Sequence, residues 1–169
     1  GGDLREELAD NINDTTEIGK HIEEKMAGRG YGLEVEVGEI GREDESGRVL
    51  TSPEEGVTFI TALNENGIKP HVLAIANGSA HGNTYDAEGN LVEQVSIDIP
   101  RTMAVAKALR DHNLDVRIAQ HGITGTPRDL IHNYFPRGDV VKGNVATFYQ
   151  NMVWDLLKVY EPELYSEVW

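Results

Sequence analysis

Two histidines, each followed by a glycine, are the residues whose types and surroundings best suit chemistry. His81-Gly82 and His121-Gly122 each follow an apolar run of strand length, at 71–76 and 116–120, that carries β-branched residues. Catalytic and ligand-binding side chains gather where a buried strand meets its loop. We therefore expect the two imidazoles to be ligands of one metal site.

Two further polar side chains stand at the corresponding ends of predicted strands. Glu36 lies near the end of 33–37, in which glutamates and aliphatic residues alternate, and Asn144 lies near the end of 139–145. The ends of parallel strands converge on one face of a barrel, so these groups would meet the histidines. Two imidazoles and a carboxylate form a donor set that zinc accepts. The competing interpretation is that the same side chains only hydrogen-bond in a polar core. The remaining histidines, which lie on predicted helix surfaces, strand starts or turns, are expected to be structural or solvated: His21, His71, His112 and His132.

The glycines that follow the histidines indicate a second kind of ligand. A residue without Cβ adopts positive φ readily and lets backbone N–H groups approach a ligand closely. The segment 122–127 leads into a predicted helix, and the segment 144–147 opens the last one. Helix N-termini favour anions through their free N–H groups and the helix dipole. Either loop alone is more often structural, but the pair beside a metal site favours a phosphate group there.

The patterns around these residues predict four strand-then-helix units with one helix, over 4–26, in front. The strands fall at 33–37, 71–76, 116–120 and 139–145, and each is followed by a helix. No linker divides the units, so we expect one domain over residues 1–169, an α/β fold of the parallel (β/α) TIM-barrel type. The apolar stripes of the first and last helices consist of Leu8, Ile12, Ile18, Ile22 and Met26, and of Phe148, Met152, Val153, Leu156 and Tyr160.

The length and composition of the chain exclude several classes of protein. The chain has 169 residues, whereas an eight-unit barrel usually needs about 250. A formal charge of −14 argues against partners such as nucleic acid or an anionic membrane. The chain has no cysteine, which excludes disulfides and thiolate metal sites and is consistent with a reducing compartment. No apolar run reaches transmembrane length and the first residues do not form a signal peptide, so we expect a soluble cytoplasmic protein.

Four motifs resemble, in order, those of the class II, metal-dependent ketose-bisphosphate aldolases, the fructose- and tagatose-bisphosphate aldolase family. They are Leu33-Glu34-Val35-Glu36-Val37-Gly38, Gly78-Ser79-Ala80-His81-Gly82, His121-Gly122-Ile123-Thr124-Gly125-Thr126-Pro127 and Lys142-Gly143-Asn144-Val145-Ala146-Thr147. The resemblance covers nearly all of this chain but only the C-terminal half of the family's barrel, about four βα units. It implies a lyase of carbohydrate metabolism, such as glycolysis, that reversibly cleaves a ketose bisphosphate to dihydroxyacetone phosphate and an aldehyde.

The resemblance also implies how the substrate and the metal are held. It implies Zn²⁺ bound by His81 and His121, with Glu36 as an accessory ligand, and a monovalent cation near the phosphate. Asn144 would orient the dihydroxyacetone phosphate part of the sugar phosphate. The residues implied to bind the phosphate are Gly82, Gly122, Thr124 and Thr147.

An acidic loop of the family matches 41–44, so the resemblance implies that Glu43 or Asp44 serves in proton transfer. The earlier strands of the family carry an Asp-His pair, in which the Asp is an acid/base and the His completes the zinc triad. Neither residue has a counterpart in this chain. Smaller departures are Thr124 where the family usually has Ser, and Ile123 where it has a small residue.

These departures leave three functions open. The first is a fragment or split subunit of an aldolase, inactive without an N-terminal half-barrel and expected to pair with that half or with a second copy of itself. The second is a half-barrel that binds metal or sugar phosphate without catalysis. The third is a structural or assembly domain, in which Glu36, His81 and His121 only form hydrogen bonds.

Overall fold

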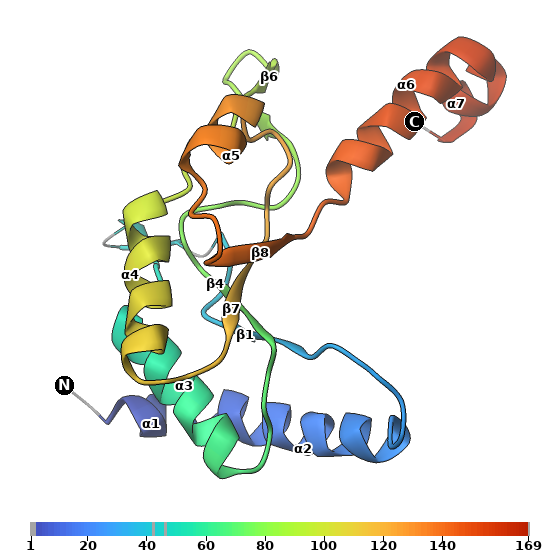
Figure 1. Ribbon diagram of the computed structural model, residues 1–169. Helices are drawn as coiled ribbons and strands as arrows, with labels where there is room; N and C mark the ends of the chain where they lie inside the picture. The colour runs from blue at the N-terminus through green and yellow to red at the C-terminus, as the bar shows by residue number, and fades with distance from the viewer. Residues whose placement is uncertain (1–2, 42, 46, 169) are drawn as a thin grey trace.

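A four-stranded parallel sheet forms the centre of the molecule. The computed structural model describes residues 3–41, 43–45 and 47–168. The strands are β1 (Glu34–Val37), β4 (Val72–Ile75), β7 (Arg117–Gln120) and β8 (Val140–Gly143), in the order β1-β4-β7-β8. Each strand is separated from the next by a helix, as the sequence predicts (Figure 1). The observed fold is therefore α/β with a parallel sheet.

Helices cover one face of this sheet. Helix α3 (Pro53–Glu65) packs against α4 (Ile99–Asp111), and both contact the strands beneath them (Figure 1). Ser52 and Glu55 form a complete capping box at the start of α3, as expected from a helix N-terminus of this sequence. The core between these helices and the sheet contains Val35, Val37, Phe59, Ile60, Leu63, Leu73, Ile75, Val105, Leu109 and Ile118, all less than a tenth exposed.

The first predicted helix differs from expectation in two respects. It is divided at Leu8 into α1 (Leu4–Glu7) and α2 (Ala9–Lys25). Ile18, part of the predicted apolar stripe, is 61% exposed, whereas Gly19 is buried. A Cβ on Gly19 would lie 3.1 Å from the Ile68 side chain, so the glycine allows α2 to approach the core there. This close contact turns Ile18 away from the core.

Two long loops carry short hairpins at the carboxyl end of the sheet. The loop after β1 contains β2 (Glu43–Asp44) paired with β3 (Gly47–Arg48). The loop after β4 contains β5 (Thr84–Tyr85) paired with β6 (Leu91–Val92). Both connections contain several glycines. None of the helices that the structure describes is both long and apolar enough to cross a bilayer.

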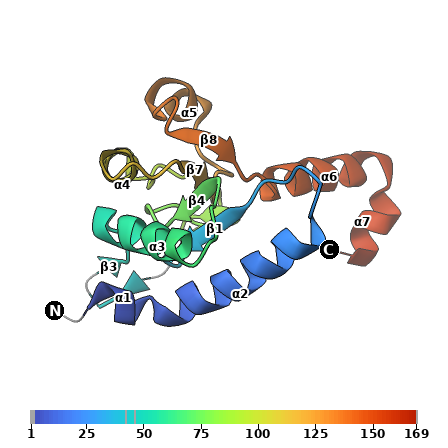
Figure 2. The same ribbon diagram turned by 60° about the horizontal axis from the view of Figure 1, so that its bottom comes forward.

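The C-terminal helices extend away from the sheet. The chain continues from β8 into α6 (Thr147–Tyr160) and α7 (Pro162–Val168), which pack on each other (Figures 1 and 2). A shorter helix, α5 (Arg128–Tyr134), lies between β7 and β8. The predicted apolar stripe of α6 is present but is not buried in this chain: Phe148, Met152, Val153, Leu156 and Tyr160 are each at least 41% exposed.

Candidate active site

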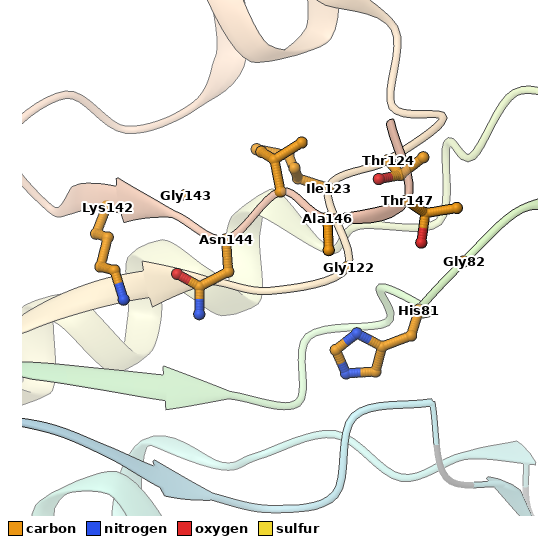
Figure 3. A pocket seen from close by; sticks show the side chains of 11 residues that line it. His81, Gly82, Gly122, Ile123, Thr124, Lys142, Gly143, Asn144, Ala146 and Thr147 are labelled. Atoms are coloured by element: carbon orange, nitrogen blue, oxygen red, sulfur yellow. The ribbon is translucent and has the colours of Figure 1, made fainter. Parts of the chain in front are cut away.

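A cavity of about 440 Å³ lies where the carboxyl ends of β7 and β8 meet the loop after β4 (Figure 3). Six of the residues that the sequence analysis selected line it: His81, Gly82, Gly122, Thr124, Asn144 and Thr147. The other lining residues are Ile123, Lys142, Gly143, Val145 and Ala146. The structure therefore brings the predicted phosphate-binding residues and one predicted metal ligand to the same cavity.

His121 lies next to His81 beside this cavity. Their imidazole rings are 6.1 Å apart between centroids, in an edge-to-face arrangement. The carboxylate of Glu36 is also close, because its Oε2 lies 3.8 Å from His121 Nδ1. The predicted ligands thus approach one another across two loops and strand β1.

A close partner of His121 is Glu34, a carboxylate that the sequence analysis did not select. Glu34 Oε1 lies 2.7 Å from His121 Nε2 and 3.0 Å from Asn144 Nδ2, and Glu34 Oε2 lies 2.6 Å from Lys142 Nζ. Asn144 Nδ2 also lies 2.5 Å from His121 Nε2, so this ring nitrogen contacts both a carboxylate and an amide group.

These contacts also act on the carboxyl of Glu34. Its partial burial alone would raise its pKa, but hydrogen bonds from Lys142, His121 and Asn144, together with the Lys142 charge, hold the pKa below its ordinary value of 4.5. Glu34 is therefore the anion that ties β1 to the end of β7 and to β8. Strands β1 and β8 form opposite edges of the sheet. Because Glu34 on β1 nevertheless bonds to Lys142 and Asn144, the sheet curves toward the face that carries Glu34.

The side chains predicted to bind a metal are of types that suit zinc. Two imidazoles and a carboxylate are ligands that zinc accepts. Within residues 3–41, 43–45 and 47–168, no three His, Asp or Glu side chains are placed to hold one ion. Within the described residues, His81, His121 and Glu36 therefore do not form a metal site by themselves.

Backbone groups of the cavity are suited to an anion. Gly122 has a φ of +60°, and a Cβ there would lie 2.6 Å from the carbonyl oxygen of Ala80, so only glycine fits between the two loops. Thr124 Oγ1 accepts a hydrogen bond of 3.1 Å from the N–H of Phe148 in the first turn of α6. In the described part of the chain, the N–H groups of Ala146 and Thr147 make no hydrogen bond and remain available.

A buried pair of amides fixes the strand ends beneath the cavity. Asn77 and Gln120, both almost fully buried, donate to each other's side-chain oxygens at 2.7 and 3.2 Å. Gln120 also donates to the carbonyl of His121 at 2.7 Å. The side chains that follow β4 and end β7 are therefore bonded to each other beneath the cavity.

The remaining predicted residues are the four other histidines and the two acidic residues of the loop after β1. Among the histidines expected to be structural or solvated, His71 accepts a hydrogen bond of 3.0 Å from the N–H of Leu33, and all four have exposed positions. The backbone of Glu43 and Asp44 forms β2, but their side chains lie outside the part of the chain that the structure describes. Sequence reasoning missed Glu34 and Lys142. Glu34 shares a strand face with Glu36, and that alternation was the available signal.

Solved structures of similar fold include two aldolases. The fructose-bisphosphate aldolase of Campylobacter jejuni superimposes with a TM-score of 0.61 and 22% identity, over 90% of this chain and 43% of that one. The YdjI aldolase of Escherichia coli K12 gives 0.54 and 16%, over 87% and 44%. The fructuronate-tagaturonate epimerase UxaE of Cohnella laeviribosi gives 0.58 and 14%, over 92% and 30%. At these identities the likeness concerns the fold alone, and this chain spans less than half the length of each of these proteins.

Comparison of the sequence identifies a family, whereas the solved structures show only the fold. No curated protein matches the sequence significantly. The family described as "Fructose-bisphosphate aldolase class-II", however, matches residues 5–168. That range contains all four motifs and every residue of the cavity. The chain belongs to the class II fructose-bisphosphate aldolase family.

Proposed function

We propose that this chain is the part of a zinc-dependent ketose-bisphosphate aldolase that holds the metal and the dihydroxyacetone phosphate moiety. The observation that carries the proposal is the single cavity lined by His81, Asn144 and the glycines and threonines of three loops. These residues are far apart in sequence, yet they meet at the carboxyl ends of parallel strands, where enzymes of this architecture bind substrate.

The phosphate would lie against Gly82, Gly122, Thr124 and Thr147. The free N–H groups at the start of α6 and the positive end of its dipole favour an anion there. The chain as a whole carries a charge of −14, so the site needs such local help to hold a phosphate. Lys142, at the edge of the cavity, is neutralised by Glu34 and adds little.

His81 and His121 would hold Zn²⁺, with Glu36 as an accessory ligand. When bound, zinc supplies a Lewis acid that polarises the carbonyl and hydroxyl oxygens of the ketose. A monovalent cation near the phosphate is a further expectation of the family resemblance.

The remaining steps belong to side chains of this chain and to the base that the family's earlier strands carry. That base removes the proton from the C4 hydroxyl as the C3–C4 bond breaks, and the bonding electrons remain on the dihydroxyacetone phosphate fragment. Asn144 would orient that fragment by a hydrogen bond from its amide. Glu43 or Asp44 would then deliver a proton to C3, which releases dihydroxyacetone phosphate.

The proposal includes a partner that supplies the rest of the barrel. The aldolases of similar fold are about twice as long as this chain, and β1 and β8 are unpaired on one side within the described residues. We propose one domain over residues 1–169, a C-terminal half-barrel that needs an N-terminal half or a second copy for full activity. A cytoplasmic location is part of the same proposal.

Two measurements test this function. Zinc content is determined after equilibration of wild type, His81→Ala and the control His21→Ala, whose histidine is exposed on α2. We expect zinc in wild type and the control and a loss of at least tenfold in affinity for His81→Ala. Equal zinc in all three would exclude the proposed ligands.

The second measurement separates catalysis from binding. Cleavage of fructose 1,6-bisphosphate is assayed for the chain alone and mixed with the N-terminal half of a class II aldolase. Activity only in the mixture supports a split enzyme. Zinc and phosphate binding without activity in either sample would instead favour a binding module.

A further inference from the structure

We propose that Gln94 is a positioning residue that fixes the separation of the two histidine loops. The proposal rests on the proposed function, because it concerns the loops that carry the predicted metal and phosphate ligands. Gln94 follows β6 in the long loop before α4, is 4% exposed, and is not among the described residues that line the cavity.

The side-chain amide of Gln94 bonds to both loops at once. Its Oε1 accepts from the N–H of Ala80, next to His81, and its Nε2 lies 3.2 Å from the Ala80 carbonyl oxygen. The same Nε2 donates to the carbonyl oxygens of Gly122, next to His121, at 2.9 Å and of Thr124 at 3.0 Å. One buried side chain therefore bridges the backbone beside each predicted ligand.

Gln94 is itself held in place by its own segment. Its N–H donates to the carbonyl oxygen of Gly125 at 2.8 Å. Farther along, Ser96 Oγ donates to the carbonyl of Gly78 at 2.7 Å, and the N–H of Asp98 donates to the carbonyl of Asn77 at 2.7 Å. The segment 94–98 is thus hydrogen-bonded to both loops, and these bonds hold the Gln94 backbone in place.

The amide group is matched to this position chemically. The loops present one N–H donor and three carbonyl acceptors, and only a side chain with both an acceptor and an NH₂ group satisfies both kinds. A carboxylate would place an oxygen against carbonyl oxygens, and an apolar side chain would leave all four backbone groups without this partner. Without Gln94, the two loops would keep their glycines but would lose the side chain that connects their backbones.

Gln94 therefore fixes the distance between the loop that carries His81 and the loop that carries His121. The imidazoles of His81 and His121 are 6.1 Å apart between centroids, and the proposed phosphate cradle also takes Gly82 from one loop and Gly122 from the other. A metal ion or phosphate that contacts both loops binds most tightly when their separation is set in advance. Gln94 sets that separation without contacting either ligand.

The test compares Gln94→Met with a matched control in the full-length chain. Met has a similar length to Gln but no amide. The control Asn66→Met removes a half-buried amide that donates to Thr16 Oγ1 at 3.0 Å, at the opposite end of α3 from the cavity. Both variants lose amide hydrogen bonding, so a general loss of stability affects both.

The first readout is amide hydrogen exchange of the metal-free proteins. We expect Gln94→Met to speed the exchange of the Ala80 N–H and also of the Phe148 N–H, which bonds to Thr124 in the second loop, by tenfold or more. Asn66→Met should leave the ratio of these rates to the global opening rate unchanged. Faster exchange at Ala80 alone would overturn the proposal, because the loops would then be independent.

The second readout is zinc affinity, measured by competition with a chelator. Loss of a residue that orients metal ligands typically lowers affinity by about 10–100-fold. We expect a fall in that range for Gln94→Met and a change of less than about twofold for Asn66→Met. An affinity for Gln94→Met equal to that of wild type, with both loops deprotected, would make Gln94 merely structural. If wild type itself binds no zinc, the proposed function fails, and the exchange rates alone decide the role of Gln94.

Discussion

Removal of the Glu34 carboxylate should cost much more stability than removal of the neighbouring Glu36. Glu34 accepts hydrogen bonds from His121, Asn144 and Lys142, whereas Glu36 Oε2 lies 3.8 Å from His121 Nδ1, beyond hydrogen-bond distance. The two residues lie on the same face of β1, two positions apart. Glu36→Ala is therefore a matched control for Glu34→Ala.

The magnitude follows from the exposure of the three donors. The Lys142 side chain is 51% exposed and can return to water, so its ion pair contributes at most about 1 kcal/mol. The His121 side chain is only 16% exposed, and a hydrogen bond to a charged group contributes about 1.5–3 kcal/mol. Asn144 adds about 1 kcal/mol. Because these terms share one acceptor and are not additive, we expect Glu34→Ala to lower the free energy of unfolding by about 2–4 kcal/mol.

Urea denaturation of the metal-free proteins in the presence of a chelator measures this difference. Glu36→Ala should change the free energy of unfolding by less than about 0.5 kcal/mol, as expected for a partly exposed side chain whose carboxylate makes no hydrogen bond within the described residues. Glu34→Gln keeps an oxygen for His121 and Asn144 and should fall between the two alanine variants. Equal free energies for Glu34→Ala and Glu36→Ala would refute the assignment of Glu34 as the group that joins β1 to β8.

Three further outcomes are expected. Gly122→Ala would force a Cβ to 2.6 Å from the Ala80 carbonyl at a φ of +60°, so thermal denaturation should show a loss of about 2 kcal/mol or more. The pKa of Asp86 is lowered chiefly by hydrogen bonds from Asn90, so in an NMR titration Asn90→Ala should move it up toward 3.8. Because that pKa is depressed in the folded state, the contribution of Asp86 to hairpin stability is present above pH 3.8 and is lost as the pH falls through the folded value. Ser52→Ala removes the capping box of α3 and should cost about 1 kcal/mol in chemical denaturation.

The strands and most helices were predictable because their signals are local. The alternation over 33–37 placed the valines on one face and the glutamates on the other, and the structure buries Val35 and Val37 while Glu36 stays exposed. The convergence of strand ends then placed His81 and Asn144 at one cavity. These inferences need only the period of a strand and the parallel direction of its neighbours.

Glu34 and Gln94 escaped prediction because their roles depend on distances across the fold. Choosing a ligand near the strand end favoured Glu36 over Glu34, yet curvature of the sheet brings Lys142 and Asn144 to Glu34 instead. Gln94 lies in a loop with no motif, and its importance appears only when the backbone of two other loops surrounds its amide. Neither curvature nor loop packing leaves a periodic trace in sequence.

The last helix shows what an amphipathic pattern does and does not determine. The apolar residues of α6 follow helical spacing, so the sequence correctly predicts a helix with a hydrophobic face. It does not say which surface covers that face, and in the structure Met152 and Leu156 remain about half exposed. Strand β8, which leads into α6, is also unpaired on one side within the described residues. An exposed apolar helix beside an open sheet edge is expected where further strands would pack, and this supports the proposal that this chain forms only part of a barrel.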